Sequence, residues 1–142
     1  MIEIYPMGSL VVYMAPDHSW RLPDGPLGTR STTNFREIVW ENDHFLARSL
    51  WANGTYRSGP RIADVEVRMM LRTEEEEMIF FQYLGRADLE PHMQGKTPVI
   101  SAGRTEAPEP GRFAWLNETQ FVGKGMLDLE AGTQSYEMYG LK

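Results

Sequence analysis

The segment ADVEVRMMLRT, residues 63–73, decides the fold class because apolar residues recur in it at every second position. On an extended chain, one face carries Val65, Val67, Met69 and Leu71. The opposite face carries Asp64, Glu66, Arg68 and Arg72. This period of two predicts a β-strand with one face against a core.

A second predicted strand, EMIFFQYLG at residues 77–85, follows almost at once. The acidic run EEEE at residues 74–77 lies between the two apolar segments, and antiparallel neighbours need only such a short link. A contiguous run cannot wrap four carboxylates around one cation. We therefore place this run at a solvated hairpin tip.

Turn residues divide the rest of the chain into short segments rich in β-branched and aromatic residues. Turns are predicted at 15–19, 22–28, 52–54, 57–60, 94–98, 106–111 and 130–133. Further strands are predicted at 2–5, 9–14, 35–41, 44–51, 113–123 and 135–141. The result is an all-β domain over residues 1–142, an antiparallel barrel or sandwich of about eight or nine strands whose edges are covered.

Residues 86–111 contain four prolines and predict a long connection across a barrel mouth. A helix is the alternative at 86–94, and a second candidate helix is residues 41–50. No internal repeat or interdomain linker is visible.

Composition excludes several classes of protein. The net charge is -6 with scattered basic residues, which argues against a nucleic-acid partner. The longest apolar run, residues 10–15, is too short to span a bilayer, so we expect no membrane association. Cysteine is absent, which excludes disulfides and thiolate chemistry and fits a cytoplasmic location.

The three histidines, His18, His44 and His92, do not have the spacing of a metal site, so we expect no metal and no cofactor. His44 follows Asp43, but adjacent strand residues point to opposite faces, and a partly exposed structural histidine is the favoured interpretation. No nucleophile elbow or phosphate-binding loop is present.

Two features suggest chemistry. Glu66 and Arg68 share a strand face, where they could hold an anionic ligand and move a proton if that face lines a cavity. If the face meets water, they form a weak surface ion pair.

The second feature is RFAWLNETQFVGKG, residues 112–125. In a straight strand, Phe113, Trp115 and Asn117 share one face, and an amide in an aromatic wall is typical of ligand pockets. The alternative is an asparagine that binds backbone groups at a bulge or turn.

These residues carry a family resemblance. The segments GPLGTR (25–30), HFLARSLWANG (44–54), VEVRMMLRTEEEEMIFFQYLGR (65–86), RFAWLNETQFVGKG and YEMYGL (136–141) together resemble the DUF3237 family, also called UPF0311. AWLN and LRT with the downstream LGR are the most specific pieces. The chain resembles a divergent member, since Ala47, Ala52 and Glu76 stand where the family often has glycine and Glu66 where it often has aspartate.

The resemblance implies a lipocalin-like antiparallel barrel that self-associates as a homodimer or larger homo-oligomer. It also implies cofactor-free lyase or decarboxylase chemistry in aromatic catabolism or secondary metabolism. Residues carried over by position are Arg30, Glu66, Arg68, Trp115 and Asn117.

The resulting hypothesis is an enzyme of lyase, decarboxylase or isomerase type that takes a hydrophobic or aromatic, anionic metabolite into the barrel. Glu66 and Arg68 would be catalytic, and the substrate would contact Arg30, Trp51, Tyr83, Trp115 and Asn117. The alternatives are a non-catalytic small-molecule carrier and a structural domain whose barrel is filled by side chains.

Overall fold

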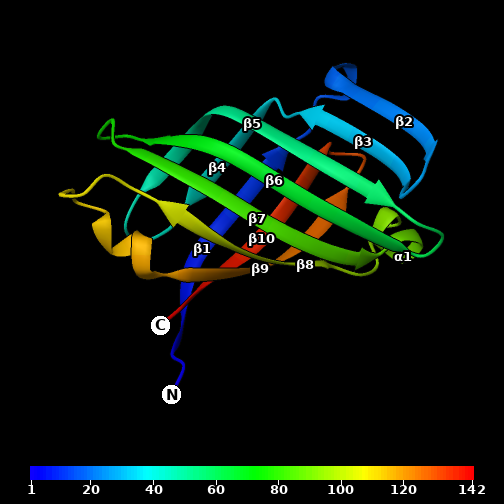
Figure 1. Cartoon of the computed structure of the whole chain (residues 1–142). Coiled ribbons are helices and arrows are strands. Elements are labelled where there is room, and N and C mark those ends of the chain that lie inside the picture. Colours follow the sequence, from blue (N-terminus) through cyan, green and yellow to red (C-terminus); the bar gives the residue numbers. More distant parts are fainter.

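Ten strands make up most of the chain in the computed structural model, which describes all 142 residues (Figure 1). The strands are β1 (Ile4–Tyr13), β2 (Ser19–Gly25), β3 (Gly28–Asn34), β4 (Glu37–Glu41), β5 (Leu46–Ser58), β6 (Ile62–Thr73), β7 (Met78–Asp88), β8 (Val99–Glu106), β9 (Gln120–Asp128) and β10 (Thr133–Leu141). The helices are short: α1 (Leu89–Met93) and the 3-10 turns η1 (Pro16–His18) and η2 (Ala114–Glu118).

The strands form one sheet that closes on itself through the pairing of β5 with β6. The closed ring consists of β1 and β4 to β10, and the β2–β3 hairpin is added where β3 pairs with the second half of β5. All pairings are antiparallel. The predicted antiparallel barrel is confirmed, and closure leaves no unpaired edge within the ring.

Strand β6 shows why the alternating pattern produces a barrel. Val67, Met69 and Leu71 are buried in the interior, while Glu66 and Arg68 are on the outside. The predicted hairpin tip is also confirmed, because β6 ends at Thr73 and β7 begins at Met78.

Aromatic rings fill one end of the barrel. The ring of Trp40 lies 5.0 Å from that of Phe81 and 5.1 Å from that of Phe121, measured between centroids. The indole Nε1 of Trp40 donates a hydrogen bond to the backbone oxygen of Met7 over 2.8 Å. Phe45 contacts both Trp40 and Phe113. Figure 1 shows η2 and the β6–β7 tip at this end, with α1 and the β2–β3 hairpin at the opposite end.

One predicted turn is a strand instead, because residues 52–54 lie within β5. The predicted turn at 22–28 contains the observed turn at Pro26 and Leu27, but β2 extends to Gly25 and β3 begins at Gly28. Gly54 is not a turn glycine, since a Cβ built on it would lie 2.5 Å from Cζ of Phe35, so glycine here makes room for a ring. The hairpin escaped the period-two pattern because β2 is exposed along almost its whole length.

The predicted connection at 86–111 is wrong in part, because it contains α1 and the barrel strand β8. The alternative of a helix at 86–94 is confirmed, and the candidate helix at 41–50 is wrong. The inward positions of β8 are Val99, Ser101, Gly103 and Thr105, and two of these four residues are polar. Hydrophobic periodicity could not reveal it for this reason.

Candidate functional site

A pocket at the α1 end of the barrel has the properties expected of a small-molecule site. Its volume is about 280 Å³, just under the range of roughly 300–1,000 Å³ typical of ligand pockets. The lining is mainly apolar, with a few polar groups. It consists of Met14, Ser31, Thr33, Phe35, Gly54, Thr55, Tyr56, Val65, His92, Met93, Leu127, Leu129 and Gln134.

The barrel register brings these residues together from distant parts of the chain. Thr33 is paired with Gly54, Tyr56 with Val65, and Leu127 with Gln134. Helix α1, which follows β7 directly, adds His92 and Met93. We call this space the mouth pocket.

The ring of Phe35 forms one wall of the mouth pocket and packs over Gly54. A neighbouring hollow of about 510 Å³ is lined by Phe35, Met14, Arg36 and residues 15–18 and 34. Phe35 and Met14 line both spaces. A rotation of the Phe35 ring would therefore change the size of the mouth pocket.

His92 is the buried imidazole of the mouth pocket, with 7% of its surface exposed. Its Nδ1 lies 2.9 Å from the backbone oxygen of Thr97. A carbonyl oxygen only accepts hydrogen bonds, so Nδ1 carries the proton. In the neutral ring Nε2 then has a lone pair, which is the arrangement of a general base.

Gln134 is also 7% exposed, and its Nε2 has no hydrogen-bond partner. Buried polar atoms are paired in most proteins, because an unpaired donor costs about 1–3 kcal/mol. Less than 1 Å² of this nitrogen is accessible, so the donor itself is not open to the mouth pocket although other atoms of Gln134 line it.

The remaining titratable group of the mouth pocket is Tyr56, whose pKa is raised by burial and lowered to a lesser extent by a hydrogen bond with Ser58. No Arg, Lys, Asp or Glu is among the lining residues. The pocket therefore contains neither a fixed cation nor a carboxylate.

Tyr83, a predicted substrate contact, lies inside the barrel rather than in the mouth pocket. Its ring is 5.2 Å from that of Tyr136, and the adjoining space is too small for a water molecule. Burial raises the pKa of Tyr83 well above its usual value and raises the pKa of Tyr136. Both phenols are therefore neutral at ordinary pH.

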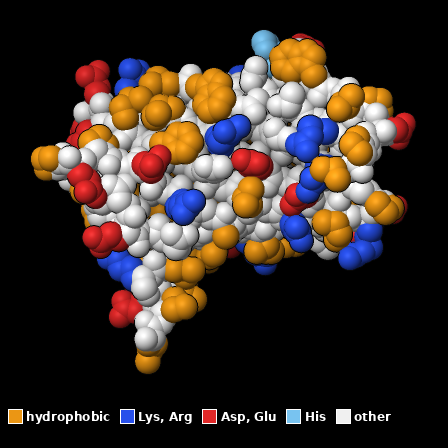
Figure 2. Space-filling model, viewed as in Figure 1, with side chains coloured by type: hydrophobic (Ala, Val, Ile, Leu, Met, Phe, Trp, Pro, Cys, Tyr) orange, Lys and Arg blue, Asp and Glu red, His pale blue; other side chains and the backbone are white.

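The predicted catalytic pair Glu66 and Arg68 lies on the outer face of β6. Their side chains are 44% and 53% exposed, and the Glu66 Oε1 to Arg68 Nε distance is 4.0 Å. The cavity placement is wrong, because Val65 and Val67 occupy the inward positions. Figure 2 shows basic and acidic side chains intermingled on this side of the molecule, and an exposed pair of this kind contributes little to stability.

Arg30 and Trp51, two further predicted contacts, are also on the outside. Arg30 is exposed on β3 and paired with Arg57, and 49% of Trp51 is exposed. Neither residue lines the mouth pocket.

Trp115 and Asn117 belong to η2, so the predicted strand at 113–123 is wrong in its first half, while residues 120–123 belong to β9. Oδ1 of Asn117 accepts a hydrogen bond from the backbone nitrogen of Ala107 over 2.6 Å, and its Nδ2 donates to the backbone oxygen of Ala107 over 2.9 Å. Nδ2 also donates to Oε1 of Glu109. The backbone-binding alternative for Asn117 is thus the one observed, while the Trp115 ring contacts His44.

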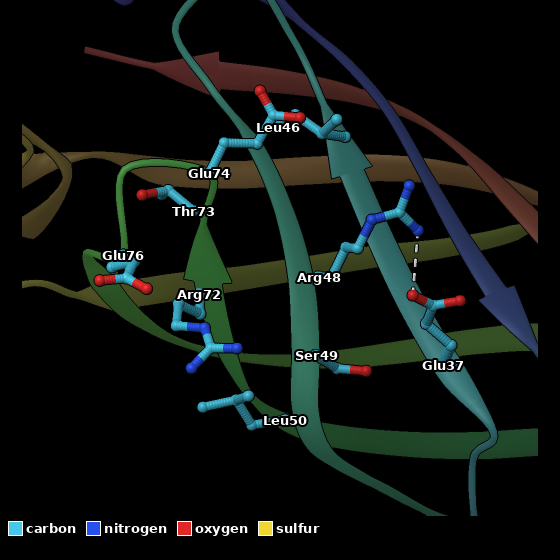
Figure 3. A pocket seen from close by; sticks show the side chains of 9 residues that line it. All are labelled: Glu37, Leu46, Arg48, Ser49, Leu50, Arg72, Thr73, Glu74 and Glu76. Atoms are coloured by element: carbon cyan, nitrogen blue, oxygen red, sulfur yellow. Dashed lines mark hydrogen bonds and ion pairs between the residues drawn. The ribbon is translucent and has the colours of Figure 1, made fainter.

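A second groove, on the outer face of β4, β5 and β6, has a volume of about 410 Å³ (Figure 3). Arg48 and Glu37 pair across it over 3.0 Å, and its apolar residues are Leu46 and Leu50. Figure 3 shows Thr73, Glu74 and Glu76 together at one end of the groove. Because the charged groups of this groove are largely in water, it offers a weaker site than the mouth pocket.

No cluster of three or more His, Cys, Asp or Glu residues has the geometry of a metal site. None of the helices has the length and apolar character needed to cross a membrane. Cytoplasmic location and self-association stay predictions.

The sequence interpretation missed His92 and Gln134. One signal was present: Gln134, Tyr136 and Met138 alternate with exposed residues in β10, which marks Gln134 as an inward position. No local pattern connects it to His92, 42 positions earlier in the sequence, since α1 brings His92 to the pocket only after the barrel closes.

Comparison with known proteins agrees with this fold. No curated protein matches the sequence. A β-barrel-like protein from Acinetobacter baumannii AYE is 24% identical, with a TM-score of 0.79 over 100% of this chain and 97% of the other. A conserved protein of unknown function from Rhodopseudomonas palustris is 12% identical, with a TM-score of 0.84 over 100% and 99%.

An enzyme from Penicillium herquei is 10% identical and has a TM-score of 0.71 over 100% of this chain and 94% of its own. At these identities the solved structures support the fold alone. The sequence profile of DUF3237, described as a protein of unknown function, matches residues 3–141. The barrel, its register and this match over nearly the whole length show that the chain belongs to the DUF3237 family.

Proposed function

We propose that this protein is a cofactor-free enzyme that takes a hydrophobic or aromatic metabolite into the mouth pocket and moves a proton on it, as isomerases and lyases do. The observation that carries the proposal is a buried histidine, oriented by a backbone carbonyl, in the wall of an apolar pocket. The relative from Penicillium herquei, described as an enzyme, supports catalysis on this fold.

His92 replaces Glu66 as the proposed proton-transfer residue. The bond from Nδ1 to Thr97 fixes the ring, and Nε2 accepts the proton. In an isomerisation the proton returns to another atom of the same guest molecule, so the step needs no oxidant, reductant or second substrate.

The mouth pocket also fits the alternative of a non-catalytic carrier, because apolar walls with a few polar groups bind ligands whether or not chemistry follows. The two functions differ in the product. A carrier returns its ligand unchanged, whereas an enzyme releases an altered molecule in amounts that exceed the protein.

The test is incubation of the protein with a panel of aromatic acids, phenols and aromatic ketones, followed by mass spectrometry and by proton exchange in D₂O. We expect turnover or deuterium incorporation for a subset of the panel and a loss of at least 100-fold in His92→Asn. Asparagine can still donate to the Thr97 oxygen but lacks the Nε2 base.

His44→Asn is the matched control, because His44 contacts Trp115 beside η2 and does not line the mouth pocket. Glu66→Gln and Arg68→Met test whether catalysis depends on the pair predicted from the sequence or on His92. Loss of turnover in these outer-face variants with full activity in His92→Asn would overturn the role of His92. Stoichiometric binding without product would favour the carrier.

A further inference from the structure

The hollow next to the mouth pocket lies where two links of the chain meet. Tyr13, the last residue of β1, is paired with Glu37, the first residue of β4, so the link after β1 and the link before β4 adjoin there. The backbone nitrogen of Arg36 donates a hydrogen bond to the backbone oxygen of Tyr13 over 3.0 Å. The backbone nitrogen of Phe35 donates to the backbone oxygen of Ala52, also over 3.0 Å. These bonds fix the backbone from which the side chains of Phe35 and Arg36 extend.

Arg36 is the only arginine or lysine that lines either the mouth pocket or the hollow. It is exposed, and its guanidinium carbon lies over the ring of Tyr13, 5.3 Å from the centroid. Arg36 forms no ion pair with any carboxylate of the chain. A guanidinium that stacks on an aromatic face keeps its in-plane N–H groups for a carboxylate. A cation with no counter-charge therefore borders an apolar pocket.

Other polar groups of the hollow suit an anion in part. His18 and Asn34 both line it and both have N–H groups. Oδ1 of Asn34 accepts a hydrogen bond from Nδ2 of Asn53 over 2.9 Å, so the amide nitrogen of Asn34 is the group that remains to donate. Asp17 is the only carboxylate in the lining, and its charge opposes the binding of an anion.

The two spaces differ in the kind of chemical group that each can hold. The mouth pocket has no charged side chain in its lining, and burial of an unpaired charge is costly. A charged end of a guest molecule would be placed at lower cost in the open hollow, where water and Arg36 can both contact it. Phe35 and Met14 line both spaces, so the apolar pocket and the charged hollow adjoin at these two side chains.

We propose that Arg36 binds the carboxylate of an aromatic acid whose ring system occupies the mouth pocket. This inference rests on the proposed function and specifies its substrate class. The observation that supports it is the position of a single unpaired arginine in the hollow that shares Phe35 and Met14 with the pocket. The anionic metabolite expected from the sequence is kept, but its charge is assigned to Arg36 and not to Arg30 or Arg68.

The test compares 2-naphthylacetate with 2-(2-naphthyl)ethanol, which has the same ring system and a neutral end. In NMR spectra of the full chain we expect both compounds to shift the methyl signals of Val65 and Leu127, and only the acid to shift the Nε–H signal of Arg36. Arg36→Gln should weaken binding of the acid by about 2- to 5-fold, the range of an exposed ion pair, and leave binding of the alcohol unchanged. Added salt should reduce the effect of the substitution on the acid.

Three further variants separate this role from a general effect of charge. Arg21→Gln is the matched control, because it removes the same charge from an exposed position on β2 that lines neither space. Binding of the acid should be unchanged in this control. Arg36→Lys keeps the charge without the planar fork and should retain part of the affinity. Asp17→Asn should strengthen binding of the acid, because it removes the opposing carboxylate from the hollow.

The outcomes separate the inference from the proposed function. If both compounds shift the signals of Val65 and Leu127 but Arg36→Gln affects the acid no more than Arg21→Gln does, the role of Arg36 is overturned and the mouth pocket stays as the site. If neither compound, and no member of the larger panel, shifts any of these signals, both proposals fail.

Discussion

At the scale of single residues, backbone conformation explains one departure from the family pattern. Glu76 stands where DUF3237 members often have glycine, and its φ of 65° lies in the left-handed region. Side chains other than glycine are strained there because Cβ approaches the following carbonyl. A glycine at this position would remove the strain, which this chain tolerates with Glu76.

Glu76→Gly should stabilise the protein by about 0.5–1 kcal/mol, since relief of left-handed strain exceeds the entropy cost of glycine in the unfolded chain. The measurement is the midpoint of urea unfolding. The control is Glu74→Gly at a neighbouring position without a positive φ, where we expect a loss of stability. Equal losses in both variants would show that the left-handed turn is not strained.

At the scale of elements, η2 and the loop before it are joined through one side chain. Asn117 binds both backbone polar groups of Ala107 and the carboxylate of Glu109. Thr105 donates to the backbone oxygen of Leu116 over 2.8 Å, so β8 and η2 are also in direct contact. These bonds explain why the segment AWLN is a 3-10 turn across the barrel end and not a strand.

Asn117→Ala should lower the free energy of unfolding by about 1–2 kcal/mol. The variant loses the hydrogen bonds to Ala107 and Glu109, and bonds to water compensate only in part. It should not alter ligand binding in the mouth pocket. Chemical unfolding and amide hydrogen exchange at residues 105–111 measure the first effect, and binding of the aromatic panel measures the second. Asn117→Asp keeps the acceptor for the Ala107 nitrogen but places a carboxylate against Glu109 and the Ala107 oxygen, so it should lose at least as much stability as Asn117→Ala. A weaker ligand affinity with unchanged stability would restore the earlier role of Asn117 as a ligand contact.

At the scale of the whole molecule, the barrel is filled at one end and hollow at the other. Trp40, Phe81 and Phe121 pack at the η2 end, and the paired rings of Tyr83 and Tyr136 lie deeper in the interior. The mouth pocket lies beyond these rings, and Phe35, packed over Gly54, forms one of its walls. The chain is thus intermediate between a ligand-binding barrel and one filled by side chains.

The buried tyrosines make the whole fold sensitive to alkali. A raised folded pKa means that the native state holds its protons more tightly than the unfolded state does. This contribution to stability is complete below the unfolded pKa of about 10 and is lost as pH rises above it.

We therefore expect the melting temperature to fall steeply between about pH 10 and pH 12. Tyr136→Phe should make the fall less steep, and Tyr13→Phe, at a position away from this pair, is the control. Equal alkaline slopes in wild type and Tyr136→Phe would contradict the role of the buried pair.

Part of the architecture followed from local sequence. The alternation in 63–73 and the acidic run at 74–77 were enough to predict β6, β7 and the turn between them, because each depends only on neighbouring residues. Strands whose inward positions are small or polar, such as β3 and β8, left no such pattern. The sites were predicted less well than the strands, since Glu66, Arg68, Arg30 and Trp51 are on the outer face.

The sequence by itself determined the period of the strands, the all-β class and the family, because these depend on residue order and turn chemistry. The alternation also predicted that the apolar face of β6 is buried, and Val67, Met69 and Leu71 on this face point into the barrel. Only the tertiary structure decided where a ligand could bind. Closure of β5 onto β6 and the position of α1 place His92 and Gln134 in the lining of the same pocket. The two residues are distant in the sequence, so no local pattern encodes this arrangement.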